Sequence, residues 1–274
     1  MPEGDTIFRA ARTLHRALAG RVVTGFDARL AQLARIDDDA PLTGRTVDSV
    51  AARGKHLLMA FSGDLVLHTH MRMNGSWHLY RPGERWRRPQ TSMRVVVATD
   101  VILAVGFDIT VAEFLTAHAL RRHPALRALG PDLLGADIDV SAIAERIRAR
   151  GPETIGDVLL DQRVVAGIGN VIKAETLFLA GVPPFAPVDG LTDARVIRVV
   201  EVARRLLTEN VAEGPFTATA AHGRRTTRSL DPGAALWVYD RSGKPCRRCG
   251  APIRADRTGL DARVTYWCPV CQAE

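Results

Sequence analysis

The chain's four cysteines stand near its C-terminus in two pairs, with two residues between the sulfurs of each pair: Cys246 and Cys249, then Cys268 and Cys271. Two such turns can aim four thiolates at one Zn²⁺ with tetrahedral geometry. The 18 residues between the pairs suit a zinc ribbon. Two disulfides, or four unrelated buried thiols, are the alternatives. The doubled pairing and the adjacent turn-forming residues favour one structural zinc ion that supplies folding free energy: Pro245, Gly250 and Pro269.

Basic charge gathers around these cysteines. The chain has a formal net charge of +7, and residues 221–274 carry ten Lys or Arg against five acids. A sequence pI near 9.8 indicates a polyanionic partner, most often nucleic acid, although basic proteins with other roles are common. Only three of the 37 basic residues are lysine: Lys55, Lys173 and Lys244. Lysine exchanges protons more readily than arginine does, so a lysine in this chain is a weak hint of chemistry. For Lys244 a residual lysine without a chemical role is the favoured interpretation.

Length and hydropathy bound the class of protein. A chain of 274 residues with 46% hydrophobic residues can bury a substantial core and is expected to form two domains. No stretch approaches the ~18 apolar residues of a membrane span, and no apolar run follows a basic N-terminus as in a signal peptide. Cysteines in metal spacing suit a reducing compartment. We therefore expect a cytoplasmic protein without a membrane partner.

The N-terminal part reads as a β-rich domain with one helix. Apolar residues at helical spacing predict a helix over 5–19, which Gly20 ends. Short β-like runs follow, and the polar stretch 81–92 is expected to be an exposed loop. We predict a β-sandwich domain over 1–115. The predicted strands are 22–26, 46–52, 56–61, 65–71, 93–98 and 101–105.

The pattern changes after residue 115. A Pro-interrupted helical stretch over 110–130 predicts a hinge, placed at 116–134. A helical domain over 135–235 and a zinc ribbon over 236–274 follow, which makes the fold class α+β. Residues 215–235 are expected to form a mobile loop. The predicted helices are 140–150, 153–163, 170–180 and 191–209.

A glycine-containing turn separates the second and third of these helices. Gly167 and Gly169 permit positive φ, and Asn170 can cap the next helix, whose N-terminus then offers an anion site. Such a turn is similar to hairpins that grip a DNA phosphate. A plain αα-hairpin is the alternative, and the glycines alone favour it.

Four segments in order give the chain a close resemblance to the formamidopyrimidine-DNA glycosylase / endonuclease VIII family of base-excision repair enzymes. They begin at the N-terminal Pro-Glu-Gly, and the Pro-Glu-Gly start and Trp77 resemble the endonuclease VIII branch more. The other segments are Arg53–Leu58, Leu160–Asn170 and Arg263–Gln272. The resemblance implies a β-sandwich followed by a helix-two-turn-helix domain and a zinc-ribbon hairpin.

The resemblance makes the N-terminal dipeptide catalytic. Removal of Met1 would free the secondary amine of Pro2, and an α-amino group of pKa about 8 is partly unprotonated at neutral pH. Pro2 would be the nucleophile that forms a Schiff base with the sugar, and Glu3 the general acid/base. Taken alone, proline at position 2 is common, and Glu3 would read as a glutamate favoured by a helix dipole.

The resemblance also implies DNA ligands. Lys55 would bind a phosphate near the lesion and donate a proton in β-elimination, while Asn170 and Arg263 would clamp neighbouring phosphates. Arg263, expected at the tip of the ribbon hairpin, would also promote δ-elimination, mainly electrostatically. The void left by the extruded base would be filled from residues 72–74, with Met73 as the apolar wedge. A Met packed in a β core is the alternative for Met73. The implied loop residues are Arg72, Met73 and Asn74.

The chain also departs from the family pattern. The Asp-Pro-Arg-Arg-Phe-Gly wedge loop of the formamidopyrimidine branch is absent, and residues 105–110 read Val-Gly-Phe-Asp-Ile-Thr instead. The loop at 72–74 is not the Gln-Leu-Tyr typical of endonuclease VIII. The preference for the base opposite the lesion therefore cannot be carried over.

The predicted function is a bifunctional DNA glycosylase/AP lyase that removes oxidised bases, pyrimidines above purines, and cleaves the strand by β,δ-elimination. The expected partner is damaged double-stranded DNA, and we expect a monomer without an organic cofactor. A non-catalytic zinc-ribbon protein that binds bent or damaged DNA is the first alternative, and an RNA-binding zinc-ribbon protein is the second. The first alternative does not need Pro2, Glu3 and Lys55 together, and a preference for single strands over duplex would support the second.

Overall fold

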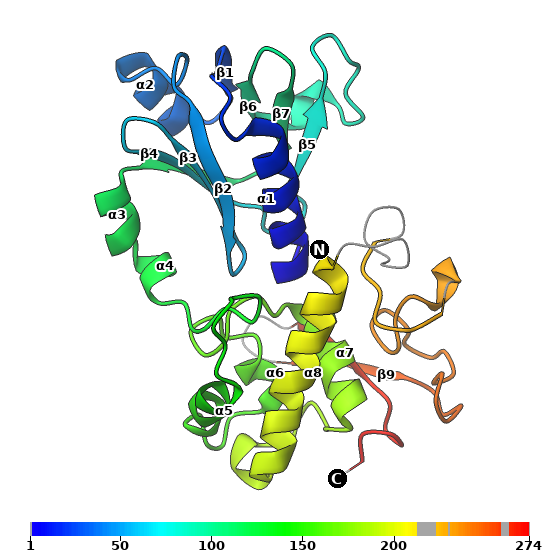
Figure 1. Ribbon diagram of the computed structural model, residues 1–274. Coiled ribbons are helices and arrows are strands. Elements are labelled where there is room, and N and C mark those ends of the chain that lie inside the picture. The colour runs from blue at the N-terminus through cyan, green and yellow to red at the C-terminus, as the bar shows by residue number, and fades with distance from the viewer. Residues whose placement is uncertain (1, 213–222, 230, 259–262, 274) are drawn as a thin grey trace. The chain divides into compact units, whose positions relative to one another are not determined.

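The computed structural model describes residues 2–212, 223–229, 231–258 and 263–273. The chain divides into two compact units, Met1–Ala128 and Leu129–Glu274. Figure 1 shows the helices and strands of both units. The finer boundaries expected at residues 115, 134 and 235 stay a prediction.

Two four-stranded antiparallel sheets form the first unit, and they share one core (Figure 1). One sheet has the order β1-β6-β7-β5, from Gly25–Ala28, Met93–Ala98, Leu103–Phe107 and Ser76–Tyr80. The other has the order β2-β3-β4-β8, from Val47–Arg53, His56–Phe61, Leu65–His70 and Val111–Leu115. Phe26 of the first sheet packs against Phe114 of the second with ring centroids 5.5 Å apart. The predicted β-sandwich is confirmed.

The helix α1, Gly4–Leu18, lies against β2 and β3 (Figure 1). Its buried residues Ile7, Ala11, Leu14 and Leu18 follow helical spacing, so one apolar stripe faces the sandwich core. Gly20, at φ 79°, follows the helix end as predicted. Because α1 begins at Gly4, Pro2 and Glu3 directly precede a helix that is packed against the sandwich.

Several elements of this unit differ from the sequence prediction. The helix α2, Ala31–Asp39, and the strand β5 were not predicted. The helical expectation over 110–130 is wrong at 111–115, where the chain forms β8 and pairs with β4. Two short helices, α3 (Ala117–Arg122) and α4 (Pro124–Arg127), follow it. The predicted loop 81–92 is confirmed over 81–89, and its last three residues form a 3-10 turn, η1, at Gln90–Ser92.

Helices surround an apolar core in the second unit (Figure 1). The central helix α7, Asn170–Ala180, is buried from Asn170 to Phe178, and Gly181 at φ 69° follows its last residue. The predicted helix 153–163 is wrong beyond the single turn α6. The surrounding helices are α5 (Val140–Arg148), α6 (Ile155–Val158), α8 (Asp193–Val211) and the 3-10 turn η2 (Val188–Gly190). A further 3-10 turn, η3 (Pro232–Ala234), precedes the ribbon.

A two-stranded hairpin follows, made of β9 (Arg254–Thr258) and β10 (Arg263–Trp267). The α+β fold class is confirmed by these elements. The predicted loop 215–235 lies partly outside the described residues. Among the helices that the structure describes, none is long and apolar enough to cross a membrane.

Candidate functional site

The N-terminal dipeptide is held by the start of α1. Glu3 is the N-cap residue of the helix, with extended backbone at φ −127° and ψ −177°, and Ile7 N donates to its carbonyl oxygen at 3.0 Å. Its side chain makes no cap hydrogen bond, and it is fully buried, whereas Pro2 is partly exposed. A carboxylate at this position is favoured by the helix dipole. The geometry therefore places Pro2 one residue before a carboxylate that the fold fixes in place.

Lys55 occupies the tight turn between β2 and β3. Gly54, at φ 57°, precedes it, and Arg53 pairs with His56 across the turn. Lys55 thus stands just before an apolar strand, as predicted. His70 stands at the end of β4, close enough to Lys55 to be affected by its charge. Burial lowers the pKa of His70 to about 4, and the positive charges of Arg72 and Lys55 lower it further. The end of this sheet is therefore a cationic region.

The sequence did not predict a cluster of three histidines around Glu113, made of His56, His68 and His123. His56 Nδ1 lies 2.8 Å from His68 Nε2, and His68 Nδ1 lies 2.9 Å from Glu113 Oε1. His123 Nε2 approaches the same carboxylate oxygen at 3.0 Å. Burial lowers the pKa of His56 to about 3, and electrostatic repulsion from His70 and His68 acts in the same direction. The residue types of His68, Glu113 and His123 could hold a metal ion, but two N–H···O hydrogen bonds already account for these contacts.

The loop 72–74 connects β4 to β5 and is exposed. Met73 is 57% exposed, so the alternative of a core methionine is wrong for it; the neighbouring Met71 is the buried one. Arg72 adopts φ 50°, which is uncommon for a residue with a side chain. Gly75 N donates to Met71 O at 2.8 Å and closes the turn. The fold therefore presents Met73 outward from a tight, strained turn.

The turn before α7 differs in detail from its prediction. Gly167 adopts φ 97°, but Gly169 is extended at φ −120° and is itself the N-cap residue. Asn170 is the first residue of α7 and does not cap it, so that expectation is wrong. The Asn170 Nδ2 group donates instead to Val264 O at 2.7 Å, and its Oδ1 atom is buried without a hydrogen-bond partner among the described residues.

Arg263 is the first residue of β10 and pairs with Thr258. The turn of this hairpin lies outside the described residues, so the expected position at the tip stays a prediction. Two side chains of α7 hold the strand beside Arg263. Asn170 bonds the backbone of Val264, and the fully buried Lys173 donates from Nζ to Thr265 Oγ1 at 2.8 Å. The sequence singled out Lys173 only by its rarity as a lysine.

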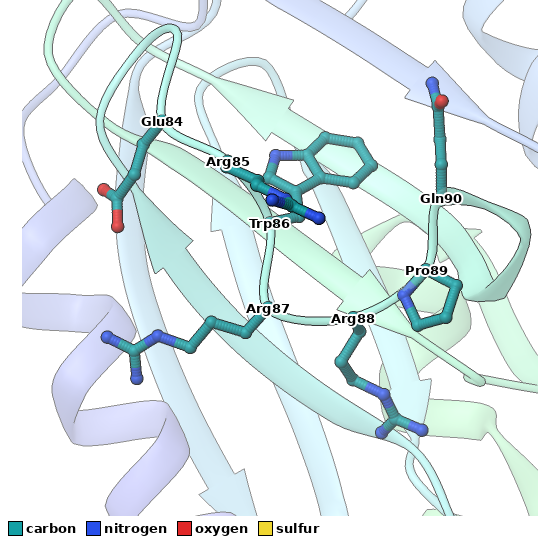
Figure 2. A pocket seen from close by; sticks show the side chains of 7 residues that line it. All are labelled: Glu84, Arg85, Trp86, Arg87, Arg88, Pro89 and Gln90. Atoms are coloured by element: carbon teal, nitrogen blue, oxygen red, sulfur yellow. The ribbon is translucent and has the colours of Figure 1, made fainter.

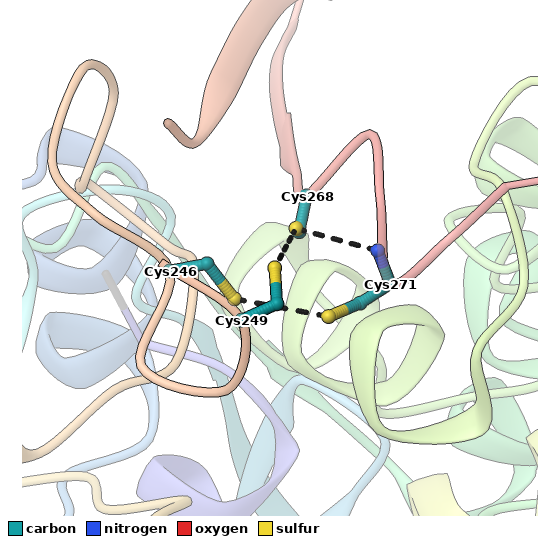
Figure 3. Close-up of side chains that lie close together, drawn as sticks. All are labelled: Cys246, Cys249, Cys268 and Cys271. Atoms are coloured by element: carbon teal, nitrogen blue, oxygen red, sulfur yellow. Dashed lines mark hydrogen bonds between the residues drawn. The ribbon is translucent and has the colours of Figure 1, made fainter. Parts of the chain in front are cut away.

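The four cysteines come together as predicted (Figure 3). Cys246 Sγ lies 3.9 Å from Cys271 Sγ, and Cys249 Sγ lies 3.5 Å from Cys268 Sγ. Four sulfurs at about 2.3 Å from one zinc ion stand about 3.8 Å apart in a tetrahedron, so the spacing fits one zinc ion. Backbone N–H groups of Arg248 and Cys271 each approach a sulfur at 3.4 Å, an arrangement that stabilises thiolates. Both predicted alternatives, disulfides and unrelated thiols, fit this geometry less well.

A buried glutamate fixes the chain that leads into the ribbon. Glu175 of α7 accepts hydrogen bonds from the backbone N–H groups of residues 237–239 at 2.8–2.9 Å and from the hydroxyl of Thr226. Burial raises the pKa of Glu175, and this effect is larger than the opposite effect of the hydrogen bonds, which lower the pKa. Arg248, between the first two cysteines, stacks over Phe178 of α7 at 4.6 Å. Sequence reasoning missed Glu175 because its partners are far along the chain.

The described residues thus form a sandwich with a helix at its start, then a set of helices and a four-cysteine hairpin. Three family profiles match the chain: the formamidopyrimidine-DNA glycosylase N-terminal domain over residues 1–122, the formamidopyrimidine-DNA glycosylase H2TH domain over 129–221, and the zinc finger found in FPG and IleRS over 243–273.

Full-length relatives agree with these profiles. The chain is 46% identical to probable endonuclease 8 2 of Streptomyces coelicolor, over 100% of this chain and 94% of that protein. It is 41% identical to the DNA-(apurinic or apyrimidinic site) lyase Nei2 of Mycolicibacterium smegmatis, over 99% of both chains. It is 33% identical to endonuclease 8 of Escherichia coli, over 99% of this chain and 100% of that protein.

A solved complex of Lactococcus lactis Fpg with DNA that contains an abasic site shares the fold, with a TM-score of 0.81 at 23% identity over 100% of both chains. The chain belongs to the formamidopyrimidine-DNA glycosylase / endonuclease VIII family. The resemblance predicted from the four sequence segments is confirmed.

Proposed function

We propose that this protein is a DNA glycosylase/AP lyase of base-excision repair that acts through the amine of Pro2. The observation that carries the proposal is its similarity over 99% of both chains to a protein named as a DNA-(apurinic or apyrimidinic site) lyase. The Pro2-Glu3 pair at the start of α1 supports it. Oxidised bases in duplex DNA are the substrates proposed, pyrimidines above purines.

The chemistry follows from a secondary amine next to a carboxyl group. Pro2 N bonds to C1′ of the deoxyribose as the base departs with a proton, and Glu3 supplies the acid/base function that opens the sugar ring. The resulting iminium acidifies the C2′ protons. Loss of one of them expels the 3′ phosphate, which is β-elimination, and a second elimination releases the 5′ phosphate. Water then frees Pro2 from the sugar remnant.

The remaining residues are proposed to position DNA. Lys55 binds a phosphate near the lesion and donates a proton in β-elimination, supported by its place in a cationic turn next to His70. Asn170 and Arg263 bind phosphates, supported by the hydrogen bond that joins Asn170 to the strand of Arg263. Met73, with Arg72 and Asn74 beside it, enters the space that the extruded base leaves, which its 57% exposure permits.

One zinc ion held by the four cysteines is a structural group in this scheme: it fixes the hairpin of Arg263 and takes no part in the reaction. A monomeric state, the lack of an organic cofactor and a cytoplasmic location stay predictions.

Borohydride trapping tests the function. The protein is incubated with duplex that holds an oxidised pyrimidine or an abasic site, and sodium borohydride should reduce the iminium to a stable protein–DNA adduct. Peptide mapping should locate the adduct at Pro2. A version with one extra N-terminal residue, which blocks the amine, should bind the duplex but give no adduct.

Two results would count against the proposal. An adduct of equal yield with the blocked N-terminus would exclude Pro2 as the nucleophile. Tight binding to damaged duplex with no adduct and no strand cleavage from either protein would favour the non-catalytic DNA-binding alternative.

A further inference from the structure

The loop between β5 and β6, residues 81–92, carries an arginine cluster that the proposed function does not use. It contains four arginines against one acid, Glu84: Arg81, Arg85, Arg87 and Arg88. Residues 84–90 line an open pocket of ≈ 590 Å³ (Figure 2). We call residues 84–88 the arginine segment. A positive net charge by itself is also typical of an ordinary solvated surface. The contacts that hold the segment in place are therefore needed to argue for a binding role.

Aromatic packing anchors the arginine segment to the sandwich. The Trp86 ring lies 6.3 Å from the Tyr80 ring and 5.7 Å from the Phe107 ring, measured between centroids. The backbone N–H of Arg87 donates to the Tyr80 hydroxyl at 3.1 Å. Packing of the partly buried Trp86 ring against residues of β5 and β7 therefore fixes the backbone that carries Arg85 and Arg87.

Arg88 joins the arginine segment to the loop that presents Met73. Its Nη2 group pairs with the Asp108 carboxylate at 2.5 Å, while Nη1 donates to Ser76 Oγ at 3.1 Å and approaches Asn74 O at 3.4 Å. One guanidinium thus bridges the 81–92 loop, the start of β5 and the 72–74 loop. The arginine segment is consequently a neighbour of Met73 that the fold holds in place.

The two remaining arginines of the segment face solvent. Arg85 and Arg87 are exposed, and neither guanidinium has a hydrogen-bond or ion-pair partner among the residues that the structure describes. Figure 2 shows the Arg87 and Arg88 side chains extending in different directions, so the arginine that anchors the segment leaves its neighbour available. Because the backbone beneath these two side chains is anchored, binding an anion orders only the side chains, whereas cations on a flexible loop also lose backbone freedom.

We propose that the arginine segment is a second DNA-contacting surface, in which Arg85 and Arg87 bind phosphates of the duplex beside the base step that Met73 enters. This inference rests on the proposed function for the presence of duplex DNA and for the role of Met73. Phosphate contacts of this kind position a protein on DNA without reading its sequence. The segment would therefore help hold the duplex in register while Met73 fills the void.

The salt dependence of duplex binding tests the proposal. Each phosphate contact contributes about 0.9 to the slope of log K against log salt concentration. The double variant Arg85→Gln/Arg87→Gln should lower the slope by about 1.8. Between about 50 and 200 mM salt, the unaltered protein should then lose about twelvefold more affinity than the variant.

The control is Arg29→Gln/Arg35→Gln, which also removes two positive charges from exposed arginines. These two lie near β1, at the opposite edge of the same sheet. It should leave the slope unchanged. A normal slope in the Arg85/Arg87 variant, or an equal loss in the control, would overturn the proposal, since the segment would then be a solvated face. The borohydride adduct of the unaltered protein reports separately on the proposed function, so the two failures are distinguishable.

Discussion

Replacement of Gly75 by alanine tests whether the turn that presents Met73 must be as tight as the structure makes it. An alanine Cβ at this position would lie 2.5 Å from Met71 O and 2.8 Å from Met71 Cα. Both are backbone atoms within the same turn, so no side chain can rotate away. The turn must open by roughly 0.5 Å or more, and overpacking of this kind costs about 1–3 kcal/mol.

Two measurements follow for Gly75→Ala. The thermal midpoint of the first unit should fall by roughly 4–10 °C. Excision of an oxidised base should slow more than cleavage at a preformed abasic site, because only excision needs the wedge to hold a base out of the stack. Single-turnover rates on the two duplexes measure that ratio.

Gly25→Ala is the matched control, since its Cβ would meet only Ala98 Cβ, at 3.7 Å, in ordinary contact. Glycine within a strand is less stable than alanine by about 0.5–1 kcal/mol, so this variant should melt at the same temperature or slightly higher. An unchanged melting temperature and an unchanged rate ratio in Gly75→Ala would refute the reasoning about the turn.

Acid should destabilise the first unit through its histidines. The folded-state pKa values of His56 and His70, about 3 and about 4, lie below the unfolded value of 6.5. Their neutral forms thus contribute stability that is complete above pH 6.5 and is lost as the pH falls toward 4, by up to about 2.7 kcal/mol per pH unit for two protons. Urea unfolding between pH 4.5 and pH 7 should show this slope, and His56→Gln should remove about half of it; an identical slope would contradict the assignment. The unaltered protein should contain one zinc per chain by elemental analysis. Cys268→Ser should lose the zinc and bind duplex at least tenfold more weakly while the first unit melts normally, and full zinc retention would contradict four-cysteine ligation.

Local patterns predicted the elements whose signal is contained in a short segment. The α1 helix follows from apolar spacing and a terminating glycine, and β3 follows from an alternation that buries Leu57, Met59 and Phe61. The strand β5 was missed although Trp77 and Leu79 alternate with polar residues. For α2 the signal was weak, because only Leu33 of its residues is buried.

Elements that depend on distant partners were predicted wrongly. Residues 111–115 carry a helix-like apolar content, but pairing of His68 with Glu113 and of its neighbours along β4 makes them a strand. The chain after Ile155 leaves helical geometry within one turn. There Gly156 packs so closely on Pro184 that an added Cβ would lie 2.8 Å from its carbonyl oxygen.

The sequence by itself determined the family, the sandwich-plus-ribbon architecture and the four-cysteine site, because motif spacing and short-range periodicity are properties of neighbouring residues. Only the tertiary structure decided the histidine cluster around Glu113, the tie between Asn170 and the strand of Arg263, and the Arg88 bridge to the loop of Met73. Those contacts join residues 45, 94 and 14 positions apart. Strand register and helix packing set such distances, and no local pattern encodes them.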